Sequence, residues 1–237
     1  MTENELISRI IYRDALMLVL DKPFGLPVHP GPKGGITLTD HLHYLRFGLP
    51  KQPQLAHRLD KDTSGCLVLG RHAKALSRLG RLFHENHVEK TYIAVVDGLP
   101  DTEEGEIDIP LASRSPTRGW WMKADPCGQP AQTYWRVLGR KDGFTTLELK
   151  PKTGRTHQLR VHCAESGWPI VGDTIYGKAE RFSPLRLHLH AYSILLPLYP
   201  KKEPLFIAAN IPEDMKELLT LPPGFNLYPA SSMDKNL

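Results

Sequence analysis

The chain has 237 residues, of which 41% are hydrophobic and 24% charged, values ordinary for a folded protein with a sizeable core. Its apolar runs are too short for a membrane-spanning helix, and the polar start Met-Thr-Glu-Asn-Glu does not resemble a secretion signal. We therefore expect a cytoplasmic protein that is not associated with a membrane. A net charge of +4 permits an acidic partner without requiring one. Three scattered cysteines, never in C-x-x-C, predict reduced structural thiols.

The first predicted elements are two β-like runs at residues 7–12 and 15–20, and the break at Arg13-Asp14 between them predicts a hairpin. Four prolines and four glycines within residues 22–35 predict a loop. Leucines at helical spacing then predict a helix over residues 37–47, with Thr37 as its N-cap and Gly48 ending it.

Residues 57–65, which read His-Arg-Leu-Asp-Lys-Asp-Thr-Ser-Gly, form the densest group of polar side chains. They lie between a short apolar segment (54–56) and a β-like run (66–69), so we predict a strand, a polar turn and a strand. Such a turn can present chemistry, although Asp60 and Asp62 could simply favour the turn itself. Ser64 lacks the G-x-S-x-G context of a nucleophile, and His57 lacks a metal-ligand partner at usable spacing.

An amphipathic helix is predicted over residues 72–86, and four cations follow at i, i+3, i+7 and i+10 on the side away from the core. This basic stripe consists of Arg71, Lys74, Arg78 and Arg81. The stripe is either a solvated helix face or a surface that binds phosphate groups.

Short β-like runs follow at 90–97, 105–111, 120–124, 132–138 and 144–149, with no helix between them, which predicts a mostly antiparallel sheet. Tyr92, Ala94 and Val96 share one face of the first run. Residues 113–123 carry several cations and Trp120-Trp121. They predict either a basic aromatic finger or a hairpin whose tryptophans pack on the sheet.

A second group of polar residues spans 150–160, where a turn at 153–155 precedes a helix predicted over 157–165 with Thr156 as its cap. Arg160 on this helix is either a solvent-exposed or a functional arginine. Strands are predicted at 185–196 and 205–209 and a helix at 212–219; His188 and His190 share a strand face without a third ligand, so no metal site is expected. Residues 1–221 are predicted to form one domain and 222–237 a loosely ordered tail.

The string His-Arg-Leu-Asp-x-x-Thr-Ser-Gly at 57–65 resembles the signature of the RluA-type RNA pseudouridine synthases, and all seven specified residues are present. Further motifs of that family are matched in order at residues 22–29, 90–98, 151–162, 172–177 and 187–191, so the resemblance covers residues 15–210. The chain departs from the family at Gly70-Arg71. It also has too few residues before position 15 for the S4 RNA-binding domain of many relatives, which leaves the target RNA open.

The resemblance implies an α+β fold, the pseudouridine synthase fold, with a long mixed, mainly antiparallel sheet, flanking helices and a central catalytic cleft. The implied reaction isomerises a uridine in a tRNA or rRNA stem-loop to pseudouridine and needs no cofactor or metal. The expected partner is structured RNA, bound by a monomer. An RNA-binding protein without catalysis and a hydrolase that uses Asp60 and Asp62 are the alternatives.

The resemblance also implies roles for single residues. Asp60 matches the catalytic aspartate, Arg160 the arginine that pairs with it, and Tyr92 the residue that stacks on the base. The nucleotide must flip out of its stack to be reached, so His57 and Arg58 are expected to fill the vacated space or hold phosphate. Lys22 is expected to shape the wall of the cleft, and the basic stripe to contact RNA phosphates.

Overall fold

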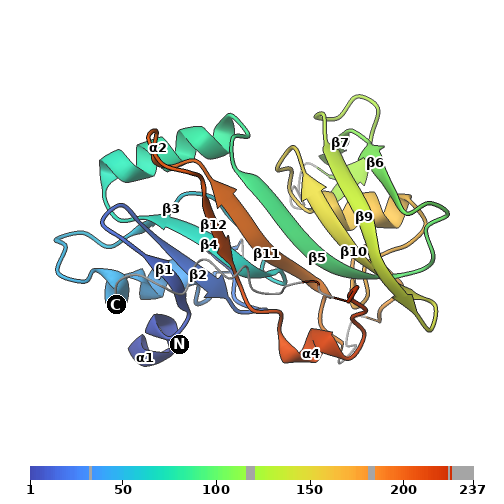
Figure 1. Ribbon diagram of the computed structural model, residues 1–237, viewed down its shortest axis with the longest axis horizontal. Helices are drawn as coiled ribbons and strands as arrows, with labels where there is room; N and C mark the ends of the chain where they lie inside the picture. Colours follow the sequence, from blue (N-terminus) through green and yellow to red (C-terminus); the bar gives the residue numbers. More distant parts are fainter. Residues whose placement is uncertain (32–33, 116–120, 181–184, 224, 226–237) are drawn as a thin grey trace. The chain divides into compact units, whose positions relative to one another are not determined.

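The computed structural model describes residues 1–31, 34–115, 121–180, 185–223 and 225 (Figure 1). The described residues divide into two compact units. The first comprises 1–89 and 191–210, and the second 90–190 and 211–225. No helix among the described residues is long and apolar enough to cross a membrane.

The described strands include a ten-stranded, mainly antiparallel sheet, which confirms the predicted fold class. In the first unit the strand order is β1-β2-β4-β11, with β3 beside β4 and β12 beside β11. In the second unit the order is β5-β10-β9-β6, and β7 pairs with β8 as a separate hairpin. Strand β11 (Leu189–Leu196) begins in the second unit and continues in the first.

The first unit opens with helix α1 (Glu3–Ile7), which includes Ile7, the first residue of the strand predicted over 7–12; the observed strand starts later, at Ile10. A capping box explains the difference, because the Thr2 hydroxyl accepts from the Glu5 N–H while the Glu5 carboxylate accepts from the Thr2 N–H. The predicted hairpin follows as β1 (Ile10–Arg13) and β2 (Met17–Lys22). The helix predicted from Thr37 is a 3-10 helix, η1 (Leu38–Leu45).

The rest of the first unit consists of β3 (Gln54–Leu55), β4 (Ser64–Gly70), α2 (Ala73–His84), the later part of β11, and β12 (Leu205–Ala208). All seven residues of β4 are buried, because β4 is an inner strand. The core takes residues from both chain segments of the unit, among them Val19, Val68, Leu79, Ile194 and Ile207.

The second unit holds β5 (Glu89–Asp97), β6 (Glu104–Asp108), β7 (Leu111–Ser113), β8 (Met122–Ala124), β9 (Gln132–Lys141), β10 (Phe144–Pro151), α3 (Gln158–Glu165) and α4 (Glu213–Lys216). As predicted from alternation, Tyr92, Ala94 and Val96 face one core. Helix α3 packs Leu159 and Cys163 into the same core.

Thr156 does not cap helix α3, contrary to the prediction. The capping position is occupied by His157, whose backbone is left-handed (φ 53°, ψ 18°) and whose side chain makes no capping hydrogen bond. Within the segment 113–123, Ser113 of β7 pairs with Met122 of β8, whereas residues 116–120, which include Arg118 and Trp120, lie outside the described residues. Most of the predicted tail lies outside them as well.

Candidate active site

The predicted catalytic turn of the first unit lies between β3 and β4, as the sequence indicated. Leu59 is buried and anchors the turn, while Asp60 beside it is half-buried. The turn closes where the Thr63 N–H donates to the Asp60 carbonyl oxygen at 3.2 Å. Asp60 therefore lies on a turn that is anchored by buried residues before it, at Leu59, and after it, at Thr63.

Glycine is required at position 65, directly after this turn. Gly65 has φ +108°, and a Cβ atom there would lie 2.2 Å from the carbonyl oxygen of Ala191 in β11. Any side chain would push β4 away from its neighbouring strand, so the glycine of the motif is explained by backbone packing.

Lys22, which the resemblance placed on the cleft wall, is 1% exposed. Its ammonium group donates to the carbonyl oxygens of Pro23 at 2.8 Å, Leu26 at 2.9 Å and Lys61 at 3.0 Å. An ammonium group has three protons to donate, and all three have carbonyl acceptors here. Lys22 thus joins the loop after β2 to the turn that carries Asp60, an arrangement that favours a structural role over a phosphate contact.

His57 and Arg58 differ in their surroundings. The His57 ring stacks on Phe83 of α2 with centroids 4.3 Å apart, and its Nε2 accepts from the Val68 N–H at 3.0 Å. Because Nε2 accepts, the ring proton sits on Nδ1 when His57 is neutral. Arg58 is exposed, so of these two residues it is the one free to reach a ligand in solvent.

The basic stripe falls partly on α2. Lys74 and Arg81 are exposed and Arg78 is half-buried on the helix, in agreement with the predicted outward face. Arg71 lies before the helix, and its Nη1 donates to the carbonyl oxygen of Asp14 at 2.5 Å. The His72 side chain caps the helix by accepting from the Ala75 N–H.

In the second unit, Tyr92 lies near the start of β5, half-buried against the core that contains Ala94 and Val96. Lys90 shares its strand face, two residues earlier. Burial lowers the pKa of Lys90 below its ordinary value, because desolvation disfavours the charged ammonium group.

The turn before α3 is held by the buried side chain of Gln158. Its Oε1 accepts from the Thr153 hydroxyl at 2.8 Å and the Arg155 N–H at 3.0 Å. Its Nε2 donates to the Gln132 carbonyl oxygen at 2.9 Å and the Thr133 hydroxyl at 3.0 Å. All four hydrogen bonds of the amide group are satisfied, which fixes the turn against β9 and the helix that carries Arg160.

Arg160 is buried, which excludes the solvent-exposed alternative. Its Nε donates to Oδ2 of Asp173 at 2.8 Å and its Nη2 to Oδ1 at 2.7 Å, a bidentate ion pair. Burial alone would raise the pKa of Asp173. The Arg160 guanidinium stabilises the ionised carboxylate by its hydrogen bonds and its charge, and the N–H groups of Ile175 and Tyr176 also donate to it. Together these interactions more than offset burial, so the pKa of Asp173 lies below its ordinary value.

Tyr176 completes this part of the site. Its ring centroid lies 5.3 Å from the central carbon of the Arg160 guanidinium. Its hydroxyl accepts from the Met122 N–H at 2.9 Å and lies 2.9 Å from Nδ1 of His157. The sequence analysis identified Asp173 and Tyr176 only as members of the family motif at residues 172–177. It did not predict their contact with Arg160.

Two of the buried histidines, His162 and His188, have hydrogen-bond partners in the second unit. His162 is bonded through Nδ1 to the Thr133 hydroxyl and through Nε2 to the Ile109 carbonyl oxygen. His188 is bonded through Nδ1 to the Arg186 carbonyl oxygen at 2.8 Å. Burial lowers the pKa of both rings. Within the described part of the chain, no three His, Cys, Asp or Glu side chains are grouped so that they could hold a metal ion.

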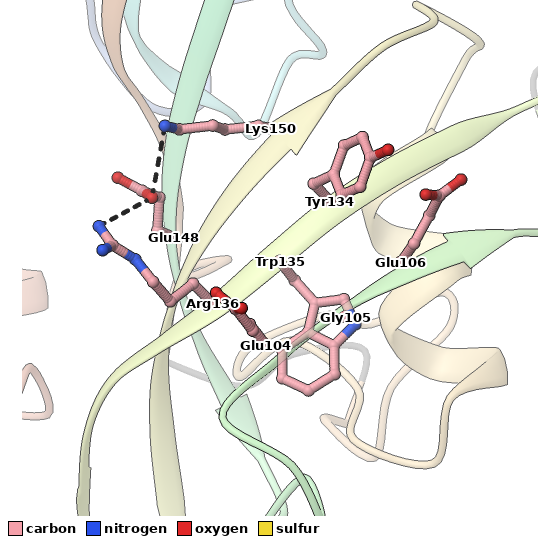
Figure 2. Close-up of a pocket in the computed structure, with 8 residues that line it drawn as sticks. All are labelled: Glu104, Gly105, Glu106, Tyr134, Trp135, Arg136, Glu148 and Lys150. Atoms are coloured by element: carbon pink, nitrogen blue, oxygen red, sulfur yellow. Dashed lines mark ion pairs between the residues drawn. The ribbon is translucent and has the colours of Figure 1, made fainter.

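Two hollows of about 510 Å³ each lie in the second unit. Figure 2 shows one over β6, β9 and β10, where Glu148 pairs with Arg136 at 3.1 Å and with Lys150 at 3.6 Å. Glu104 and Glu106 also line it, and three carboxylates make it a poor site for RNA phosphates. None of the predicted site residues lines this hollow.

The second hollow adjoins the turn before α3. It is lined by residues of the β7–β8 hairpin and by the turn residues Gly154, Arg155 and Thr156. The Arg155 side chain is fixed by a hydrogen bond from Nε to the Pro130 carbonyl oxygen at 3.0 Å. This hollow, unlike the first, has a cation from a family motif in its wall.

Comparisons with known proteins agree with the motifs. A family model described as RNA pseudouridylate synthase matches residues 16–165. An uncharacterized RNA pseudouridine synthase of Zymomonas mobilis is 41% identical over 215 residues, covering 90% of this chain and 98% of that protein. The ribosomal large subunit pseudouridine synthase C of Buchnera aphidicola is 33% identical over 225 residues, covering 91% and 71%.

Among solved structures, the human RNA pseudouridylate synthase domain containing 4 is similar with a TM-score of 0.76 and 30% identity, covering 90% of this chain and 92% of that chain. The family model matches more than half of the chain, and the Zymomonas relative is covered almost completely. The chain therefore belongs to the RluA-type RNA pseudouridine synthases, isomerases that convert uridine in RNA to pseudouridine.

Proposed function

We propose that Asp60, Tyr92 and Arg160 carry out the isomerisation of a uridine in the loop of a tRNA or rRNA stem-loop. The observation that supports this most strongly is the buried, bidentate ion pair that fixes the Arg160 guanidinium, since an arginine held in one orientation is suited to act on one anionic group. The half-buried Asp60 on an anchored turn meets the same requirement for a fixed carboxylate.

The reaction breaks the bond between N1 of uracil and C1′ of ribose and forms a bond between C5 and C1′. The hydrogen on C5 leaves as a proton and N1 takes up a proton, so the atoms balance. In the proposed mechanism, the Asp60 carboxylate acts at the sugar, either by adding to C1′ or by proton transfer that leads to a glycal. Tyr92 stacks on the detached base and keeps it in place while it turns. No atom is gained or lost, so the step requires no external donor or oxidant.

The target nucleotide must leave its stack before Asp60 can reach it. We propose that the exposed Arg58 occupies the vacated space or holds the neighbouring phosphate, since the His57 ring is engaged with Phe83 and Val68. The exposed Lys74 and Arg81 on α2, with Arg78, are the proposed contacts to the RNA backbone. Arg71 is the least suited of the four, because its Nη1 is bonded to the Asp14 carbonyl oxygen.

The name of the Buchnera relative points to the large ribosomal subunit, so ribosomal RNA is the first substrate to test and transfer RNA the second. Side chains cannot read the deep major groove of an A-form stem, so recognition is expected to use a loop with splayed bases. Because several named relatives are bacterial, we infer that the protein acts in the cytoplasm.

The deciding experiment is to delete the gene and map which uridine ceases to be pseudouridine in cellular RNA. That loop is then offered to the purified protein as an isolated hairpin of roughly 15 to 20 nucleotides, the footprint of a small RNA-binding module. We expect the hairpin to be modified nearly as well as the intact RNA. Activity on the intact RNA alone would show that recognition extends beyond the loop, and no change in any uridine would refute the proposal.

A further inference from the structure

We propose that Asp173 and Tyr176 are positioning residues, in which Asp173 fixes the orientation of the Arg160 guanidinium and Tyr176 ties that orientation to the β7–β8 hairpin. The inference rests on the proposed catalytic role of Arg160. All the groups involved belong to the second unit, so the argument depends only on contacts within that unit.

The contact between Asp173 and Arg160 determines the plane of the guanidinium. Two parallel hydrogen bonds engage Nε and Nη2, and the two side chains are 1% and 4% exposed. Oδ1 of Asp173 also accepts from the N–H groups of Ile175 and Tyr176, at 2.9 and 3.0 Å, so the carboxylate is itself fixed to its loop. The pair thereby determines where the remaining edge of the guanidinium points.

Glycine before Asp173 permits this close packing. Gly172 has φ +76°, and a Cβ there would lie 1.9 Å from the Arg186 carbonyl oxygen. A buried ion pair contributes little net stability compared with packed hydrophobic residues. Control of the orientation of Arg160 is therefore a better explanation of the pair than stability.

Tyr176 contacts three residues, of which two belong to α3 and its N-cap and one to β8. Its ring lies against the Arg160 guanidinium, 5.3 Å from centroid to central carbon. Its hydroxyl accepts from the Met122 N–H and still has its own proton to donate, which the nearby Nδ1 of a neutral His157 can accept. The left-handed backbone of His157 brings its ring to this position.

Met122 connects the tyrosine to the hollow beside the turn before α3. It begins β8, pairs with Ser113 of β7, and lines the hollow that also contains Arg155. A nucleotide in this hollow would contact the strand whose N–H bonds to Tyr176. A displacement of the hairpin would then be transmitted to Arg160 through the hydrogen bond between Met122 and Tyr176 and the ring contact between Tyr176 and Arg160. The arginine should therefore favour one orientation when the hollow holds a nucleotide and another when it is empty.

The first test separates the chemical step from binding. Single-turnover rates are measured with saturating, unmodified large-subunit ribosomal RNA transcribed in vitro, or transfer RNA transcript if only that is modified, and Kd is measured separately. Loss of a charged hydrogen-bond partner in Asp173→Asn should lower the rate roughly 10- to 100-fold, and loss of a neutral one in Tyr176→Phe about 2- to 10-fold, with Kd unchanged. A folded Tyr176→Phe protein with the wild-type rate would overturn the proposal.

Matched controls come from the same unit. Asp97→Asn removes a carboxylate that pairs with Lys178 at 2.9 Å near the surface, and Tyr134→Phe removes the hydroxyl of an exposed tyrosine. Both controls should keep the wild-type rate. Equal losses in the controls would show that the assay reports general damage to the unit and would refute a specific role.

A double-mutant cycle distinguishes positioning from an independent role. Arg160→Lys keeps the charge but cannot form the two parallel hydrogen bonds. If Asp173 acts through Arg160, Asp173→Asn should reduce the rate of the Arg160→Lys protein by less than about twofold. Losses that multiply would overturn the proposal, whereas wild-type rates for Arg160→Lys and Arg160→Met would refute the catalytic role of Arg160 itself.

Hydrogen exchange tests the link to the hairpin without using activity. In Tyr176→Phe the Met122 amide loses its acceptor, so it should exchange about tenfold faster, while amides of β9 and β10 are unchanged. This measurement still decides the matter if Asp173→Asn fails to fold. An unchanged exchange rate at Met122 would overturn the proposed coupling.

Discussion

The ammonium group of Lys22 donates to the carbonyl oxygen of Lys61 at 3.0 Å, immediately after Asp60 in the chain. This hydrogen bond links residues 39 positions apart and joins the family motif at residues 22–29 to the signature turn at residues 57–65. A side chain that is 1% exposed thus controls the backbone next to the proposed catalytic carboxylate.

Replacing Lys22 by Met should destabilise the protein by about 3 kcal/mol, because three carbonyl oxygens would lose their donor in a buried setting. Urea unfolding measures this change. Lys61→Met is the matched control, since it removes an exposed side chain and keeps the carbonyl oxygen that Lys22 binds. Normal stability with a weaker, less salt-dependent affinity for RNA would instead identify Lys22 as a phosphate contact.

Asp60→Asn should abolish isomerisation and leave folding and RNA affinity nearly intact, because the amide keeps the shape of the carboxylate and loses its charge. Pseudouridine and free uracil are quantified together after incubation with RNA. Asp62→Asn, in the same turn, should cost far less. Similar losses at both positions, accompanied by released uracil, would favour a hydrolase that uses both carboxylates.

Replacing the exposed Lys74 and Arg81 by Gln should weaken RNA binding and flatten its salt dependence by about 1.4 units, near 0.7 for each lost phosphate contact on single-stranded RNA. Affinity is measured at several salt concentrations. Lys141 and Lys201, also exposed but outside the stripe, provide a double Gln control of equal charge. An unchanged slope would mean that the stripe is a solvated helix face.

Stability should fall as the pH drops below about 6.5, the pKa of histidine in an unfolded chain. Burial lowers the pKa of His188, so below pH 6.5 the unfolded chain binds a proton that the folded ring refuses. In the His188→Asn protein the amide can still donate to the Arg186 carbonyl oxygen. The substitution should reduce the slope of the free energy of unfolding with pH by up to about 1.4 kcal/mol per pH unit.

The pH effect is measured by urea unfolding between pH 7 and pH 5. His162 is also buried with a lowered pKa, so part of the slope should persist in the His188→Asn protein. A His188→Asn protein with the wild-type slope would contradict the prediction.

Local patterns predicted the strands well, because alternation and turn residues act over a few positions. The face shared by Tyr92 and Ala94, and the polar turn around Asp60, followed from such patterns. Helix α1 was not predicted, and the strand predicted from residue 7 begins only at Ile10. The capping box between Thr2 and Glu5 stabilises the helix up to Ile7, which delays the start of the strand.

Pairings between distant residues could not be predicted in the same way. Arg160 and Asp173 are 13 positions apart, and Gly172, next to Asp173, packs against the backbone of Arg186, a contact that no local pattern predicts. The burial of Lys22 depends in the same way on the turn around Lys61. Charge and spacing identify such residues as candidates, but their partners are determined by tertiary structure.

The first unit is discontinuous in the chain, and this affects how the protein folds during synthesis. Its core combines residues 17–88 with Ile194, Leu196 and other residues up to position 209. The core of the second unit draws on residues 94–189. As the chain leaves the ribosome, the second core can thus form while β4, next to the Asp60 turn, still awaits β11. The Asp60 turn is synthesised early but is among the last parts to reach its folded environment. A chain whose synthesis stops before residue 190 lacks the residues that complete the first unit.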